Sequence, residues 1–128
     1  MSESPRFARV VYRIAAIYGL VALLPQYVLE QRIGEDTPPP ITHPEYFYGF
    51  VGVALAWQLA FLLIAKDPVR YRAFMPVTWL EKVTFGVAAL VLFALGRIPT
   101  VMAIAGSIDL VLAAAFVMAF VRTPAVKG

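Results

Sequence analysis

The chain contains no cysteine and only one histidine, His43. Without cysteine it has no disulfide framework, no thiolate metal site, no thiol redox centre and no cysteine nucleophile. One histidine also leaves the usual zinc ligand sets incomplete, so we predict no metal site and no cofactor. The sequence has no glycine-rich phosphate loop, dinucleotide fingerprint, nucleophile elbow or zinc-helix motif. We therefore assign no catalytic residue, and an enzyme is not the favoured interpretation.

Charge is also scarce. Charged residues make up 15% and hydrophobic residues 61% of the 128 residues, whereas soluble domains are about 25% charged and roughly 45–50% apolar. A soluble domain of this size could not bury so much apolar surface, so the surrounding medium must be lipid. The net charge of +3 is modest and the basic residues are spread along the chain. Nucleic acid is therefore not an expected partner.

The sequence contains four long apolar runs. They predict transmembrane helices at residues 10–29, 46–65, 79–95 and 101–121, close to the ~20 residues that cross a bilayer core. Between the first two, residues 30–43 contain three consecutive prolines and are expected to form an extended, solvated loop. No small-residue cleavage site follows the first run, which we interpret as an uncleaved span. The sequence predicts one all-α domain, an antiparallel four-helix transmembrane bundle.

The distribution of basic residues predicts the orientation of this bundle. Nine would lie on one side of the membrane and two, Arg32 and Arg97, on the other. By the positive-inside rule, both termini face the cytoplasm of a bacterial inner membrane. The nine are Arg6, Arg9, Arg13, Lys66, Arg70, Arg72, Lys82, Arg122 and Lys127.

Small residues predict where the helices approach one another, because lipid supplies no hydrophobic drive for their association. Gly52, Ala56 and Ala60 follow at steps of four in the second span and make one candidate contact stripe. Gly86 in the third span and Gly106 in the fourth are further candidates.

The fourth span carries an acid, Asp109, about 12 Å along the helix from Val101. A charged residue at such depth costs roughly 2.5–3.5 kcal/mol on insertion scales, so polar groups from other helices are expected to face it. Gln58 and Tyr18 lie at similar depths, and the protonated acid would donate a hydrogen bond to one of them. The predicted ligand-binding residues are Asp109, Gln58, Tyr18, Trp57, Ser107 and Thr84.

Two interpretations of Asp109 stay open. Low-dielectric surroundings favour a neutral carboxyl group unless a cation arrives, which would make Asp109 a proton- or cation-responsive ligand. Alternatively, Asp109 is a structural hydrogen-bonding residue that holds helices or protomers together.

A second candidate site lies at the predicted inner interface. There Glu81 and Lys82 would join Arg70 and Arg72, and the three basic residues would bind a phospholipid headgroup. The alternative is a salt-bridged boundary from which the Lys82 side chain snorkels to the membrane surface.

The layout is similar to that of small bacterial four-span membrane proteins. In outline it also resembles the emopamil-binding and sigma-2-receptor group, through a proline-containing first helix, a long outer loop and the second-helix sequence PEYFYGFVGVALAWQLAFLLI. The resemblance implies four helices that enclose an apolar pocket, with membrane acids that hold amine ligands or sterol intermediates. Gln58 occupies a part of the second helix where that group would have an acid.

We therefore expect an integral inner-membrane protein that holds a small hydrophobic or cationic ligand, or a partner helix, around Asp109. The alternatives are a membrane-embedded isomerase-type enzyme that uses Asp109 as acid or base, and a non-catalytic accessory subunit of a membrane complex. Membrane lipids are expected partners, and the sequence leaves open whether the chain works alone, as a homodimer or in a larger complex.

Overall fold

The computed structural model describes residues 5–126 and is helical, with no strand in that part of the chain. This confirms the predicted all-α class. The elements are α1 (Arg6–Leu23), η1 (Leu24–Val28), α2 (Glu30–Asp36), α3 (Pro44–Lys66), η2 (Arg72–Phe74), α4 (Met75–Ala94) and α5 (Thr100–Arg122). Lys127, which was counted in the charge distribution, lies outside the described residues.

Four helical segments are long and apolar enough to cross a membrane. Each has 23 residues and is therefore about 35 Å long. Large apolar side chains cover their outer faces: Ile14, Val21 and Val111 are 58%, 69% and 69% exposed. Such a surface is unfavourable in water and compatible with acyl chains, so the fold indicates a multi-pass integral membrane protein.

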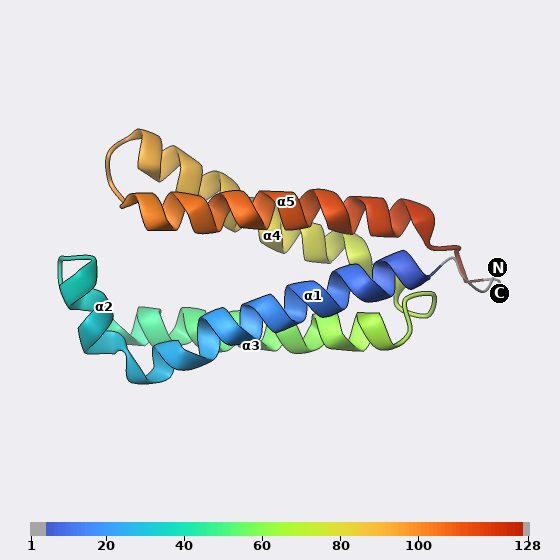
Figure 1. Cartoon of the computed structure of the whole chain (residues 1–128), viewed down its shortest axis with the longest axis horizontal. Helices are drawn as coiled ribbons and strands as arrows, with labels where there is room; N and C mark the ends of the chain where they lie inside the picture. Colours follow the sequence, from blue (N-terminus) through green and yellow to red (C-terminus); the bar gives the residue numbers. More distant parts are fainter. Residues whose placement is uncertain (1–4, 127–128) are drawn as a thin grey trace.

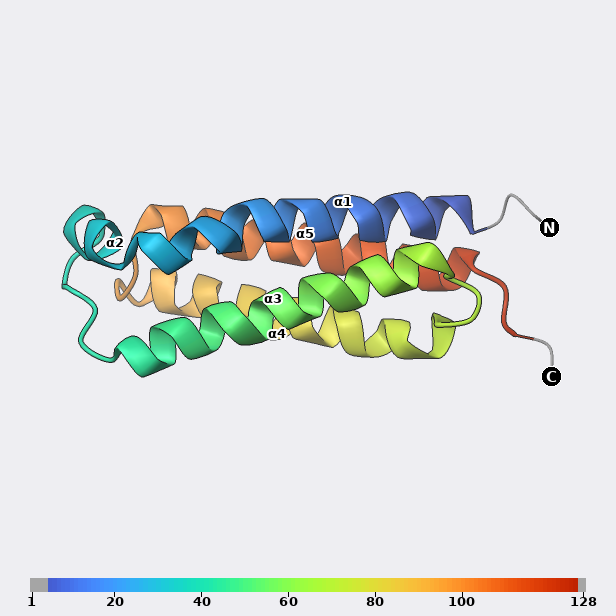
Figure 2. The ribbon, with the colours of Figure 1, turned by 90° about the horizontal axis from the view of Figure 1, so that it is seen from below.

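The four long helices form two pairs along a common axis (Figures 1 and 2). α1 packs chiefly on α3, α4 packs chiefly on α5, and the pairs meet mainly where α1 contacts α5. The beginning of α1 and the end of α5 lie at one end of the molecule, where Arg122 covers the ring of Phe7. We call this the terminal end; α2 lies at the opposite end, the α2 end.

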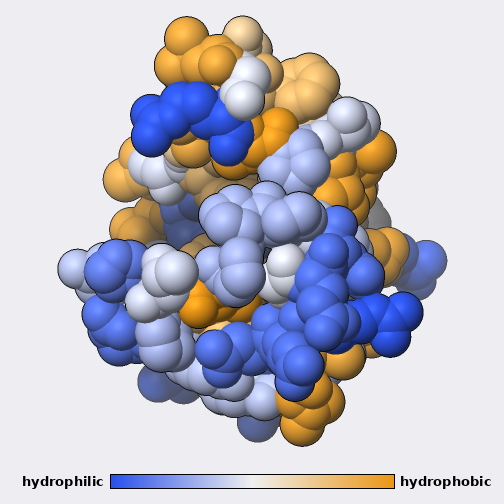
Figure 3. Space-filling view, turned by 90° about the vertical axis from the view of Figure 1, so that its left-hand side faces the viewer, coloured by the Kyte–Doolittle hydropathy of each residue, from blue (hydrophilic) through white to orange (hydrophobic). Residues whose placement is uncertain are grey.

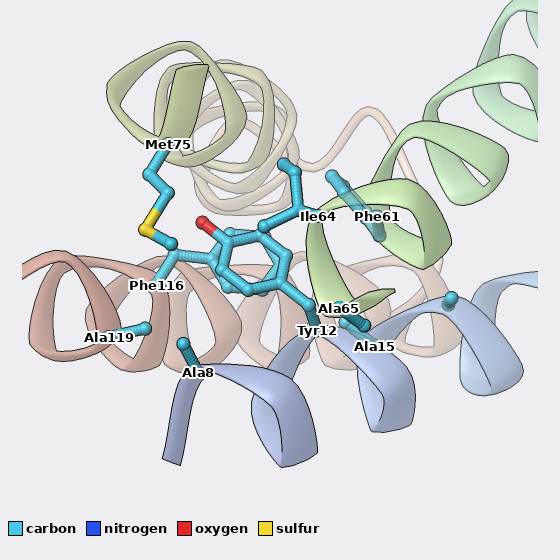
Figure 4. Packing of buried hydrophobic residues seen from close by; sticks show 10 residues of the cluster. Ala8, Tyr12, Ala15, Phe61, Ile64, Ala65, Met75, Phe116 and Ala119 are labelled. Carbon is cyan, nitrogen blue, oxygen red and sulfur yellow. The ribbon is translucent and has the colours of Figure 1, made fainter. Parts of the chain in front are cut away.

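Aromatic packing joins the two pairs near the terminal end (Figure 4). The ring of Tyr12 in α1 stacks on Phe116 in α5, with ring centroids 4.2 Å apart, and Phe61 of α3 lies edge-on to Phe116. The Tyr12 hydroxyl is 2.7 Å from the Thr78 hydroxyl of α4. One cluster near the terminal end therefore connects all four long helices.

Small residues bring α4 and α5 close together, as predicted for Gly86 and Gly106. A Cβ atom at Gly86 would lie 2.6 Å from the Leu110 side chain and 2.9 Å from the Gly106 carbonyl oxygen. A Cβ atom at Gly106 would lie 2.6 Å from Ala89. These separations are too short for any side chain, so the two backbones can approach only because both positions are glycine.

The predicted stripe of Gly52, Ala56 and Ala60 is wrong as a helix contact. None of the three is buried, and a Cβ atom at Gly52 would meet only the Tyr27 hydroxyl, at 3.5 Å. α3 instead turns a different face inward, which includes Gln58.

The predicted extended loop contains a helix, α2. Glu30 stands in its first turn, where a negative charge favours the helix, and Arg32 pairs with Asp36 at 3.1 Å one turn later. Thr37 then donates a side-chain hydrogen bond to the Ile33 carbonyl, and the prolines that follow end the helix. The first half of the predicted loop is therefore helical, and the prolines only end this helix.

Candidate intramembrane polar site

A cavity of about 390 Å³ lies between the helix pairs, toward the α2 end. Pockets of roughly 300–1,000 Å³ commonly hold small molecules. Figure 3 views the molecule from this end and shows hydrophilic atoms set back between apolar patches. The polar residues on the cavity wall are Tyr18, Gln26, Asp36, Thr37, Gln58, Glu81, Lys82 and Asp109.

The central polar contact joins α4 to α5. The Lys82 ammonium donates a hydrogen bond to Asp109 Oδ1 at 3.4 Å, and the two residues are only 4% and 9% exposed. The Lys82 ammonium also lies 5.3 Å from the centre of the Phe61 ring. Asp109 therefore has a positive partner from a neighbouring helix, which offsets part of the cost of placing a carboxylate in the membrane.

Two acceptor oxygens beside this pair have no hydrogen-bond partner. They are Gln58 Oε1 and Glu81 Oε1, and both are buried. The Glu81 oxygen is 4.0 Å from the Lys82 ammonium, which is too long for a hydrogen bond. A buried acceptor without a partner costs about 1–3 kcal/mol. Both residues line the cavity, so a donor that enters would reach these two unused acceptors once the side chains turn toward it.

Gln58 is held in place by its own helix and by a glycine on the facing helix. Its amide nitrogen donates to the Ala54 carbonyl at 2.8 Å, and its oxygen has no hydrogen-bond donor. A Cβ atom at Gly19 of α1 would occupy the space of the Gln58 amide group. Glycine at position 19 is therefore what lets the amide reach the cavity wall.

The cavity brings together three of the predicted residues, Asp109, Gln58 and Tyr18. The expected bond from Asp109 to Gln58 or Tyr18 is not formed, because Lys82 takes the carboxylate. Trp57 and Thr84 line an adjacent groove between α3 and α4 instead. Ser107 is on neither wall, and its hydroxyl donates to the Ala103 carbonyl of its own helix.

The structure separates the residues of the predicted headgroup site. Lys82 does not snorkel: α4 begins at Met75 rather than at residue 79, so Lys82 lies two turns inside the helix, where Asp109 can pair with it. Arg72 donates to the Phe120 and Thr123 carbonyls at 3.2 and 2.6 Å and lies over the Phe120 ring. Arg72 thus caps the end of α5, whereas Arg70 is exposed.

The sequence interpretation placed Glu81 and Lys82 at the inner interface, whereas both lie on the cavity wall. A signal was available, because Lys82 is ten residues beyond Arg72 and so about 15 Å along a continuous helix. Lys82 and Asp109 thus lie at similar depths in consecutive spans, where opposite charges favour an ion pair.

The chain was compared with known proteins at three levels. No protein-family model matches the sequence, no curated protein is similar to it, and no solved structure matches its fold. The resemblance to the emopamil-binding and sigma-2-receptor group stays a prediction.

Proposed function

We propose that the protein binds a small amphiphilic molecule in the cavity between its helix pairs. The observation that carries this proposal is the pair of buried acceptors, Gln58 Oε1 and Glu81 Oε1, which have no partner on the wall of the cavity. A ligand that donates hydrogen bonds would satisfy both and recover their desolvation cost.

Charge favours a cationic head for this ligand. Three carboxyl groups, Asp36, Glu81 and Asp109, and one ammonium group, Lys82, line the cavity. Asp36 is paired with Arg32, so the other three groups give a formal charge of −1 when all are ionised. A primary ammonium would neutralise this charge and supply donors to Glu81 and Gln58. The apolar part of the ligand would contact Leu23, Phe50 and Phe85 on the same wall.

Dodecylamine is a suitable probe, since it combines a primary ammonium with an apolar chain. Native mass spectrometry of the detergent-solubilised protein should show one retained dodecylamine per chain. Ala105→Phe should abolish retention because Ala105 lines the cavity, whereas Ala114→Phe, on an exposed position of the same helix, should not. Equal retention by all three proteins would mean adsorption to the lipid-facing surface and would refute the proposal.

The proposed setting is a bacterial inner membrane, with the antiparallel bundle oriented so that both termini are cytoplasmic. Basic residues near the terminal end and the acidic character of α2 support this orientation. The chain has no cysteine, so single cysteines report topology directly. A membrane-impermeant maleimide should label Gln31→Cys in intact spheroplasts and Ala125→Cys only after lysis; the opposite pattern would invert the topology.

An isomerase-type enzyme is the second candidate. It is favoured by the presence of two carboxyl groups beside an ammonium group on the wall of one cavity, since moving a double bond requires an acid and a base. This function predicts that a molecule recovered from protein kept in D₂O carries deuterium on carbon. A recovered molecule without deuterium would support binding alone.

A further inference from the structure

The helices α3 and α4 follow one another in the chain but contact each other little. In Figure 1 they are close at the loop that joins them and spread apart toward the α2 end. The reason is that each long helix has its main contact elsewhere, α3 on α1 and α4 on α5. One side of the bundle is therefore less tightly closed than the others.

A groove of about 330 Å³ occupies this side. Its lining is apolar except for Glu81 and Thr84, and the Thr84 hydroxyl already donates to the Glu81 carbonyl. Four residues line both the groove and the central cavity: Phe50, Ala54, Glu81 and Phe85. The wall between the membrane-facing groove and the polar site is thus a single layer of side chains.

Two of the four residues in this wall are aromatic. Phe50 of α3 and Phe85 of α4 stack with their centroids 6.2 Å apart. Neither ring can hydrogen-bond, so only packing holds them in place, and rotation of one side chain would join the groove to the cavity. Glu81 lies on the same wall with its carboxylate oxygen unpartnered.

The opposite approach, from the α2 end, carries polar side chains. Gln26, Asp36 and Thr37 lie on that rim beside the apolar Ile33, Val101 and Met102. Each of the three polar residues already has a partner: the Ala22 carbonyl, Arg32 and the Ile33 carbonyl. A molecule dissolved in the acyl region would have to leave the bilayer to enter there, whereas the groove faces the acyl region directly.

We propose that the α3–α4 groove is the portal through which a single-chain amphiphile passes from the bilayer into the polar site, with the Phe50–Phe85 pair as its gate. The inference rests on the proposed function and adds the source of the ligand, the membrane. The donor head group would reach Glu81 first, because that residue lies on the wall that the groove and the cavity share.

A kinetic experiment tests the portal. In a Trp79→Phe background, Trp57 on the groove is the only tryptophan, and dibromododecylamine added to proteoliposomes should quench it as it binds. A portal bridge joins Val53→Cys to Thr84→Cys across the groove through a reducible bifunctional thiol reagent. A matched control bridge joins Thr37→Cys to Met102→Cys at the α2 end of the cavity.

The portal bridge should slow both association and dissociation about tenfold, equivalent to an added barrier of ~1.4 kcal/mol. The equilibrium affinity should stay nearly unchanged, and reduction should restore the rates. The control bridge should leave both rates as they were. As a second variant, Phe85→Ala without any bridge removes one ring of the Phe50–Phe85 pair and should accelerate both association and dissociation.

The outcomes separate the two proposals. Slowing by the control bridge alone, or unchanged rates with the portal bridge and in Phe85→Ala, would overturn the portal and leave the binding function standing. No saturable quenching in the unbridged protein would overturn both.

Discussion

Lys82 of α4 and Asp109 of α5 are 27 residues apart in the sequence and form an ion pair, with 3.4 Å between Nζ and Oδ1, inside the helix bundle. The pair joins α4 to α5 beside the cavity, and on the same wall Glu81 Oε1 and Gln58 Oε1 have no hydrogen-bond donor. This contact between two helices agrees with the structural interpretation of Asp109, and its ligand-binding role stays a proposal.

Removal of one member of the pair should be far more harmful than removal of both. Asp109→Leu leaves the Lys82 ammonium buried without its hydrogen-bonded partner, and we expect a loss of about 3 kcal/mol in the free energy of unfolding. The double variant Lys82→Met with Asp109→Leu should lie within about 1 kcal/mol of wild type. Unfolding in mixed micelles of the wild type, the two single variants and the double variant completes a double-mutant cycle. If the two single losses simply added up in the double variant, the pair would not be coupled.

Gly19→Ala should disturb the site through Gln58. The new Cβ atom takes the space of the Gln58 amide, so the side chain must move and stability should fall by about 1–3 kcal/mol. Adding Gln58→Ala should recover most of that loss. Gly49→Ala is the control, since nothing lies within 4 Å of its Cβ position. Thermal unfolding that does not distinguish the two glycine variants would contradict this packing.

The approach of α4 to α5 makes a separate prediction. Gly106→Ala places a methyl group against Ala89, and overpacking of this kind costs about 1–3 kcal/mol. Gly52→Ala has only an ordinary contact, with the Tyr27 hydroxyl, and should be neutral or slightly stabilising. A larger loss for Gly52→Ala than for Gly106→Ala in chemical unfolding would restore the contact stripe that the sequence suggested.

Arg72 should act as a helix cap and not as a lipid ligand. Arg72→Gln loses charge-assisted hydrogen bonds to two carbonyl groups at the end of α5 and should lower the free energy of unfolding by about 1.5–3 kcal/mol. Arg70→Gln, on the exposed neighbour, should change it by no more than about 0.5 kcal/mol. The same two variants can be compared for retention of anionic phospholipid. Equal destabilisation with parallel lipid loss would support the headgroup site instead.

The sequence predicted what depends on composition and length: the four apolar helices, and Gly86 and Gly106 as candidate helix-contact residues. It did not predict the partner of Asp109, because that depends on where α4 begins, and Met75-Pro76 gave a weaker boundary signal than Trp79. The face that α3 buries was missed for a related reason. Its residues are apolar nearly all round, so periodicity could not choose between the Gly52 stripe and the Gln58 face.

Dodecylamine affinity, compared between wild type and Glu81→Gln, tests the central claim most directly. Glu81 places a buried oxygen without a hydrogen-bond donor on the cavity wall, and a hydrogen bond between this carboxyl group and an ammonium group contributes about 1.5–3 kcal/mol. The account predicts saturable binding at one site in the wild type and an affinity at least about tenfold lower in Glu81→Gln. Equal affinity in the two proteins would contradict it.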